Sequence, residues 1–122
     1  MISLSKPLAE LYLLDECFSA HGIPFELAND AILTFNKIDP NNITLVLLQG
    51  EIAISRKYND VLLGIARAPF IKGLSTGLIQ RPSEYIYTAQ NECSGYYLPS
   101  DLAMTLIDKN QLWREAFAWL TW

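Results

Sequence analysis

Several features that would place this chain in a membrane or outside the cell are missing from its sequence. The longest apolar stretches, such as residues 43–48, are far shorter than the roughly 20 residues that a membrane-spanning helix needs. Near the N-terminus, Glu10 and Asp15 interrupt the apolar positions, which differs from the continuous apolar core of a secretion signal. We therefore expect a cytoplasmic protein that makes no membrane contact.

Residues that build metal or catalytic centres are also scarce. His21 is the only histidine, which excludes the multi-histidine metal centre of cupin-type jelly rolls. Cys17 and Cys93 lie far apart and lack the spacing of a zinc or thioredoxin-type site, so buried free thiols are expected. No phosphate-binding glycine motif occurs. The sequence thus predicts a protein that is not an enzyme and holds no metal or cofactor.

Positive charge is sparse and scattered. The nine basic residues stand singly apart from Arg56 and Lys57, and the formal net charge is -4. A nucleic-acid surface normally needs clustered lysine and arginine. This chain by itself is therefore expected to bind nucleic acid weakly or not at all.

What is present predicts one ordered, mainly β domain with flanking helices. With 51% hydrophobic residues in 122, the chain can form a core without a disulfide or a metal. Helical periodicity predicts a helix over residues 6–21, ended by Gly22. Short strand-like runs then recur about every ten residues, which is typical of a sandwich or jelly roll. These runs are residues 24–27, 31–35, 43–49, 51–55, 61–66, 70–71, 85–89 and 93–98.

Helical periodicity returns after Pro99. Ser100 is expected to cap the first of two helices, and Asn110 to begin the second. The second has more aromatic surface than a terminal helix usually leaves in water. Either this stripe covers the domain's own sheets, or the helix continues or pairs with a second copy. If the helix pairs with a second copy, the residues expected to form the dimer and coupling contact are Trp113, Phe117, Trp119, Leu120 and Trp122.

Two segments, VLLQGEIAIS and APFIKGL, resemble the cyclic-nucleotide-binding-like sensor domain of Crp/Fnr-type transcription regulators. SLSKPL and NQLWREAF are similar to the enterobacterial members described as inhibitors of hydrogen peroxide resistance. The resemblance implies a double-stranded β-helix over residues 1–109 and the start of a dimerisation helix over residues 110–122. It also implies a homodimer that meets DNA only through a winged helix-turn-helix domain missing from this chain.

The resemblance further implies a degenerate ligand pocket. Aligning FIKGL with the family's FIGEL places Gly73 where a glutamate holds the ribose, and counting back from Cys93 places Ser83 where an arginine holds the phosphate. Neither residue can make the family's contact. We therefore expect no cyclic-nucleotide binding, and an effector that is unknown or absent. The residues of this degenerate pocket are Gly73, Leu74, Ser75, Arg81, Ser83 and Tyr85.

Redox sensing is a second functional reading, because the resemblance links the chain to peroxide resistance. Cys17 follows Asp15 and Glu16, and Cys93 follows Glu92. Acidic neighbours raise a thiol pKa, whereas a sensing thiol needs a low one. The sequence therefore disfavours Cys17 and Cys93 as peroxide sensors.

The alternative to a regulator domain is a stand-alone ligand-binding jelly roll that controls a protein partner.

Overall fold

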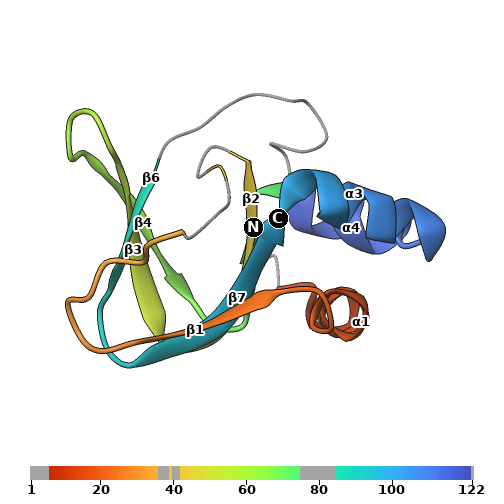
Figure 1. Ribbon diagram of the computed structural model, residues 1–122, viewed down its shortest axis with the longest axis horizontal. Coiled ribbons are helices and arrows are strands. Elements are labelled where there is room, and N and C mark those ends of the chain that lie inside the picture. Colours follow the sequence, from red (N-terminus) through yellow and green to blue (C-terminus); the bar gives the residue numbers. More distant parts are fainter. Residues whose placement is uncertain (1–5, 36–38, 40–41, 75–84, 122) are drawn as a thin grey trace, which may run out of the picture.

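The computed structural model describes residues 6–35, 39, 42–74 and 85–121. Figure 1 shows two β-sheets, with the helices gathered beside one of them. In chain order the elements are α1 (Leu8–Phe18), β1 (Ile23–Leu27), β2 (Ile43–Gln49), β3 (Glu51–Arg56), β4 (Leu62–Arg67), β5 (Phe70–Lys72), β6 (Tyr85–Ala89), β7 (Cys93–Pro99), α3 (Ser100–Lys109) and α4 (Trp113–Thr121).

The strands form two antiparallel sheets. One has the order β1-β7-β2-β5 and the other β4-β3-β6. The chain passes from the first sheet to the second at Gly50, between β2 and β3. Gly50 has a φ of +94°, and a Cβ there would lie 2.3 Å from the carbonyl oxygen of Glu92. Only glycine fits this crossing without strain.

Two hydrophobic cores lie on the two faces of the first sheet. Strand β2 serves both, since Val46 faces the helices while Leu45 and Leu47 face the other sheet, which explains its continuous apolar run. The inter-sheet core consists of Leu33, Ile43, Leu45, Leu47, Ile52, Ile54, Ala66, Tyr87, Ala89, Cys93 and Tyr97. The helix-side core consists of Leu11, Leu14, Phe18, Val46, Ile71, Leu74, Tyr96, Leu98, Ala103, Leu106, Ile107, Ala116 and Trp119.

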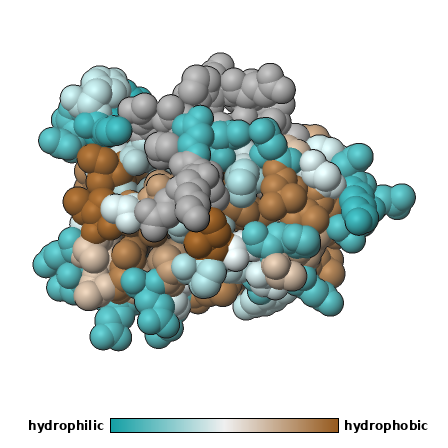
Figure 2. All heavy atoms as spheres, viewed as in Figure 1, coloured by the Kyte–Doolittle hydropathy of each residue, from teal (hydrophilic) through white to brown (hydrophobic). Residues whose placement is uncertain are grey.

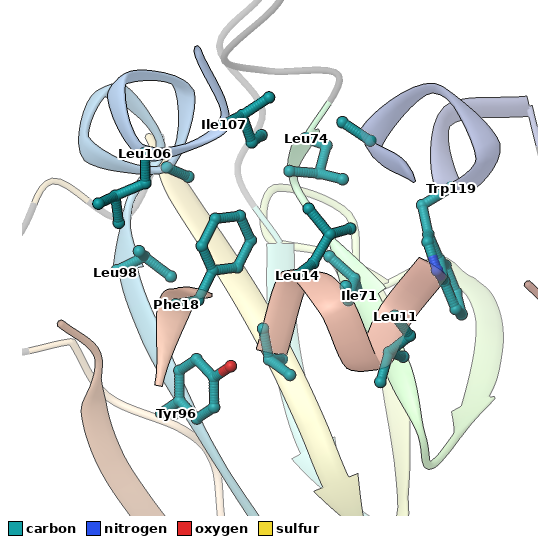
Figure 3. Packing of buried hydrophobic residues seen from close by; sticks show 13 residues of the cluster. Leu11, Leu14, Phe18, Ile71, Leu74, Tyr96, Leu98, Leu106, Ile107 and Trp119 are labelled. Atoms are coloured by element: carbon teal, nitrogen blue, oxygen red, sulfur yellow. The ribbon is translucent and has the colours of Figure 1, made fainter. Parts of the chain in front are cut away.

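The helix-side core is built on the apolar stripe of α1. Leu11, Leu14 and Phe18 are three and four positions apart, and all are fully buried. Figure 3 shows them between α1, α3 and the strands, with Trp119 of α4 near Leu11. The Tyr96 hydroxyl of β7 donates a 2.5 Å hydrogen bond to Asp15 Oδ1 of α1. This contact ties the helix to the sheet.

The structure corrects two expectations near the N-terminus. The first helix covers Leu8–Phe18 rather than residues 6–21, and Gly22 lies beyond its end. A Cβ at Gly22 would lie 2.3 Å from a ring carbon of Tyr96, so close packing explains this glycine. Residues 31–35 form no full strand: Ile32 makes an isolated bridge to Thr88. An apolar run indicates burial, but it does not show how many of its residues pair with a neighbouring strand.

Two expectations near the C-terminus are also wrong. Ser100 is not an N-cap but the first residue of α3; its buried hydroxyl lies 3.2 Å from Thr44 Oγ1 and donates to the carbonyl of Gly73. Asn110 does not begin α4. It ends α3, with its backbone N–H bonded to Leu106, and α4 starts at Trp113. None of the described helices is long and apolar enough to cross a membrane.

Candidate ligand-binding groove

A groove of about 410 Å³ lies along β4 and β5. Two of its residues on β4, Leu63 and Ile65, are exposed, and Figure 2 shows hydrophobic surface below the tip of the β3–β4 hairpin, at the left. Its volume is within the range of about 300–1,000 Å³ typical of small-molecule sites. The residues of this β4–β5 groove are Lys6, Ile54, Leu63, Gly64, Ile65, Ala66, Arg67, Phe70 and Lys72.

Gly64 creates part of this space. It pairs with Ile54 across the strands, so both positions face the same side of the sheet. A Cβ at Gly64 would meet no atom within 4 Å, unlike the other glycines for which such contacts are known, Gly22, Gly50, Gly73 and Gly95. Glycine weakens a strand interior and often marks a place where a ligand approaches the backbone.

Three cations surround the apolar surface. The Lys6 ammonium donates to the backbone oxygens of Arg67 at 2.5 Å and Pro69 at 3.2 Å. Burial, and secondly the nearby Arg67 charge, lower the pKa of Lys6. Arg67 Nε lies 3.7 Å from Glu51 Oε2. Lys72 Nζ lies 4.4 Å from the ring centroid of Tyr85, a cation–π contact. The groove therefore combines an apolar wall with positive charge.

Three of the residues predicted to form the pocket, Gly73, Leu74 and Tyr85, lie in the described part of the chain. Gly73 has a φ of +100°, and a Cβ there would lie 2.0 Å from the carbonyl oxygen of Ile43. Leu74 is buried in the helix-side core, and together with Gly73, Trp119 and Leu120 it lines a second cavity of about 290 Å³. Tyr85 lies beneath Lys72. Ser75, Arg81 and Ser83 lie outside the described residues.

The groove residues Lys6, Gly64 and Lys72 were missed by sequence reasoning. They are far apart in the chain, and only the pairing of β4 with β3 and of β5 with β2 brings them to one place. One signal was available: Gly64 interrupts an otherwise apolar strand, LLGIAR. Such an interruption can indicate a ligand site.

The aromatic stripe of α4 divides between core and surface. Trp119 is 7% exposed; its Nε1 donates a 3.0 Å hydrogen bond to the carbonyl of Pro7, and its ring meets Phe70 edge-on at 5.9 Å. Phe117 is 52% exposed and lies 6.2 Å from the ring of Trp113. Trp119 thus covers the domain's own core, and Phe117 faces outward. Trp122 lies outside the described residues.

Both cysteines are free thiols. Cys17 packs against the helix-side core and accepts a 3.2 Å hydrogen bond from Asn110 Nδ2; burial raises its pKa. Cys93 belongs to the inter-sheet core, and its Sγ donates to the carbonyl of Glu51 at 3.0 Å. His21 is exposed beyond α1. Within the described ranges, no three metal-ligating side chains come together.

Three curated proteins align with the whole chain. It is 44% identical over 122 residues to the inhibitor of hydrogen peroxide resistance of Salmonella typhimurium strain LT2, and 43% identical to that of Escherichia coli K12. The chain spans 58% of the length of each relative. It is therefore a homologue, over its full length, of part of these proteins. No family model matches the chain.

Solved structures of regulators share the fold. The c-di-GMP responsive regulator CLP of Xanthomonas campestris aligns with 90% of this chain and 57% of its own, with a TM-score of 0.67 and 17% identity. The sensor domain of DNR from Pseudomonas aeruginosa aligns with 92% and 79%, with a TM-score of 0.67 and 13% identity. The fold is therefore the mainly β, cyclic-nucleotide-binding-like fold with flanking helices that the sequence predicts.

Proposed function

We propose that this chain is the sensor and dimerisation domain of a Crp-like transcription regulator that lowers resistance to hydrogen peroxide. The observation that carries the proposal is the homology of the entire chain to inhibitors of hydrogen peroxide resistance, together with a fold found in regulator sensor domains. In this proposal the domain is cytoplasmic and non-catalytic. DNA is read by a further domain, in the part of the relatives that this chain does not cover.

A domain exchange tests this role. In an Escherichia coli strain lacking its inhibitor, we would express that inhibitor with its aligned segment replaced by this chain, and measure survival in hydrogen peroxide. The chimera is expected to restore peroxide sensitivity, whereas the same protein without the segment should not. A chimera that is produced at normal levels but leaves survival unchanged would contradict the regulator role and favour a stand-alone domain that controls a protein partner.

The proposed sensor does not use cyclic nucleotides. The resemblance aligns Gly73 with the ribose-binding glutamate, and the backbone here has no room for a side chain, since a Cβ would lie 2.0 Å from a carbonyl oxygen. Calorimetric titration of the chain with cAMP and cGMP should give no heat of binding. Micromolar affinity for either nucleotide would overturn this part of the proposal.

The proposed dimer forms through the outer side of α4. Phe117 is the exposed aromatic residue of this helix, and it lies against Trp113. Phe117→Ala should weaken self-association in sedimentation equilibrium. Tyr58→Ala is the matched control, because Tyr58 is 77% exposed but lies in the β3–β4 turn. Equal association of the two variants and the original chain would exclude this side of α4 as the dimer contact.

A further inference from the structure

We propose that the β4–β5 groove binds a small organic monoanion with an apolar body, such as a medium-chain carboxylate, and that Phe70 transmits its binding to Trp119 on α4. This inference rests on the sensor role proposed above, because it names the effector class of that sensor.

The charge of the groove indicates an anion. Three of the nine basic residues of the chain line it, although the net charge of the chain is -4. None of the described residues lining the groove is acidic. Lys72 makes no ion pair with a described residue and rests on the Tyr85 ring, which leaves its ammonium available to a carboxylate.

The walls of the groove indicate an apolar body. Ile54, Ala66 and Phe70 supply hydrophobic surface, and the missing side chain of Gly64 leaves room against the backbone of β4. A compact inorganic anion would leave this surface in contact with water. An alkyl or aryl carboxylate would cover it and bring its charge to the cations.

Phe70 connects the groove to the terminal helix. It packs against both hydrophobic cores, lines the groove, and meets the Trp119 ring edge-on at 5.9 Å. A ligand that displaces Phe70 must therefore change the surroundings of Trp119. Because Trp119 belongs to α4, occupancy of the groove would alter the packing of the helix proposed to form the dimer.

The test uses three probes with the same alkyl chain: octanoate, octanol and octylammonium. Calorimetry with the 122-residue chain should show the tightest binding for octanoate and none for octylammonium. Lys72→Met should weaken octanoate roughly tenfold, as expected for loss of a charge-assisted contact. Lys109→Met, which removes an exposed charge at the end of α3, is the control and should change nothing. Equal binding of octanol, or no effect of Lys72→Met, would overturn the anion assignment.

A second variant fills the space and keeps the charge. Gly64→Leu should abolish octanoate binding while its thermal unfolding remains cooperative, because no atom lies within 4 Å of the added Cβ. Undiminished binding by a folded Gly64→Leu protein would place the ligand elsewhere.

Fluorescence tests the connection to α4. Octanoate should change the tryptophan emission of the original chain but not of Trp119→Phe. Binding without a change in Trp119 emission would refute the role of Phe70. Failure of octanoate to bind would overturn the effector class alone, because peroxide survival of the chimera tests the sensor role independently.

Discussion

The helix-side core and the inter-sheet core share one sheet but differ in how they are closed. The first is covered by three helices and sealed at one end by Trp119, which is hydrogen-bonded to Pro7. The second borders the β4–β5 groove, where Gly64 supplies no side chain. The difference indicates that the two cores have different roles. The helix-side core stabilises the domain, while the edge of the inter-sheet core leaves space for a ligand.

Removing the centre of the helix-side core should have the largest effect. Phe18 is 0% exposed, and Phe18→Ala should lower the free energy of unfolding by about 3–5 kcal/mol, through lost burial and the cavity left behind. Urea unfolding followed by circular dichroism measures the change. Tyr58→Ala in the exposed β3–β4 turn is the control, expected to change stability by less than about 0.5 kcal/mol. Similar losses for both would show that the helix-side core is not the main source of stability.

Adding a single methyl group at Gly95 and at Gly64 compares a closely packed position of one sheet with an open position beside the groove. A Cβ at Gly95 of β7 would lie 2.1 Å from the carbonyl oxygen of Val46, so Gly95→Ala must push β7 and β2 apart, at a cost of about 1–3 kcal/mol. Gly64→Ala meets open space and should instead stabilise the strand by about 0.5–1 kcal/mol. Thermal unfolding of both variants checks the opposite signs, and a destabilised Gly64→Ala would mean that the groove is already filled.

A tyrosine in each core predicts how stability depends on pH. Burial, the hydrogen bond to Asp15 and the Asp15 charge raise the pKa of Tyr96; burial and then Tyr85 raise that of Tyr87. A raised folded-state pKa means that the contribution is complete below the unfolded pKa of about 10 and is lost as pH rises above it. Urea unfolding between about pH 9 and 11, a range that brackets this pKa, measures the loss. Tyr96→Phe should make the free energy of unfolding fall less steeply with rising pH. An unchanged slope would exclude Tyr96 as its source.

The smallest expected effect is on the reactivity of the two thiols: Cys17 packs against the helix-side core, and Cys93 belongs to the inter-sheet core. Burial raises the pKa of Cys17, and Cys93 is 4% exposed, so both should react with iodoacetamide at neutral pH more slowly than an unhindered cysteine. The variants Cys17→Ser and Cys93→Ser isolate each thiol for mass spectrometry. Rapid sulfenylation of either one at low peroxide would make that cysteine a direct sensor.

Much of the fold could be predicted because its signals are local. Helical periodicity identified α1, α3 and α4, and most strand runs recur in the structure with boundaries shifted by one or two residues. The failures have a common cause. Ser100 has the composition of a cap and residues 31–35 that of a strand, but their partners, Thr44 and Thr88, lie far away in the sequence.

The candidate site was less predictable than the fold. Aligned motifs directed attention to Gly73 and Leu74, and the structure places Gly73 against the Ile43 carbonyl and Leu74 in the helix-side core. The β4–β5 groove is lined by other residues, among them Gly64 and Lys72. No spacing rule could have joined these residues to Lys6, since their proximity depends on how strands and N-terminus pack.

The sequence by itself determined the order of most elements and the absence of a side chain at Gly50 and Gly73, because each depends on residue type and near neighbours. Only the tertiary structure decided that Trp119 is buried while Phe117 is exposed, and that three cations meet at one groove. Periodicity identifies the apolar face of an element, but packing determines what covers that face and where it remains open.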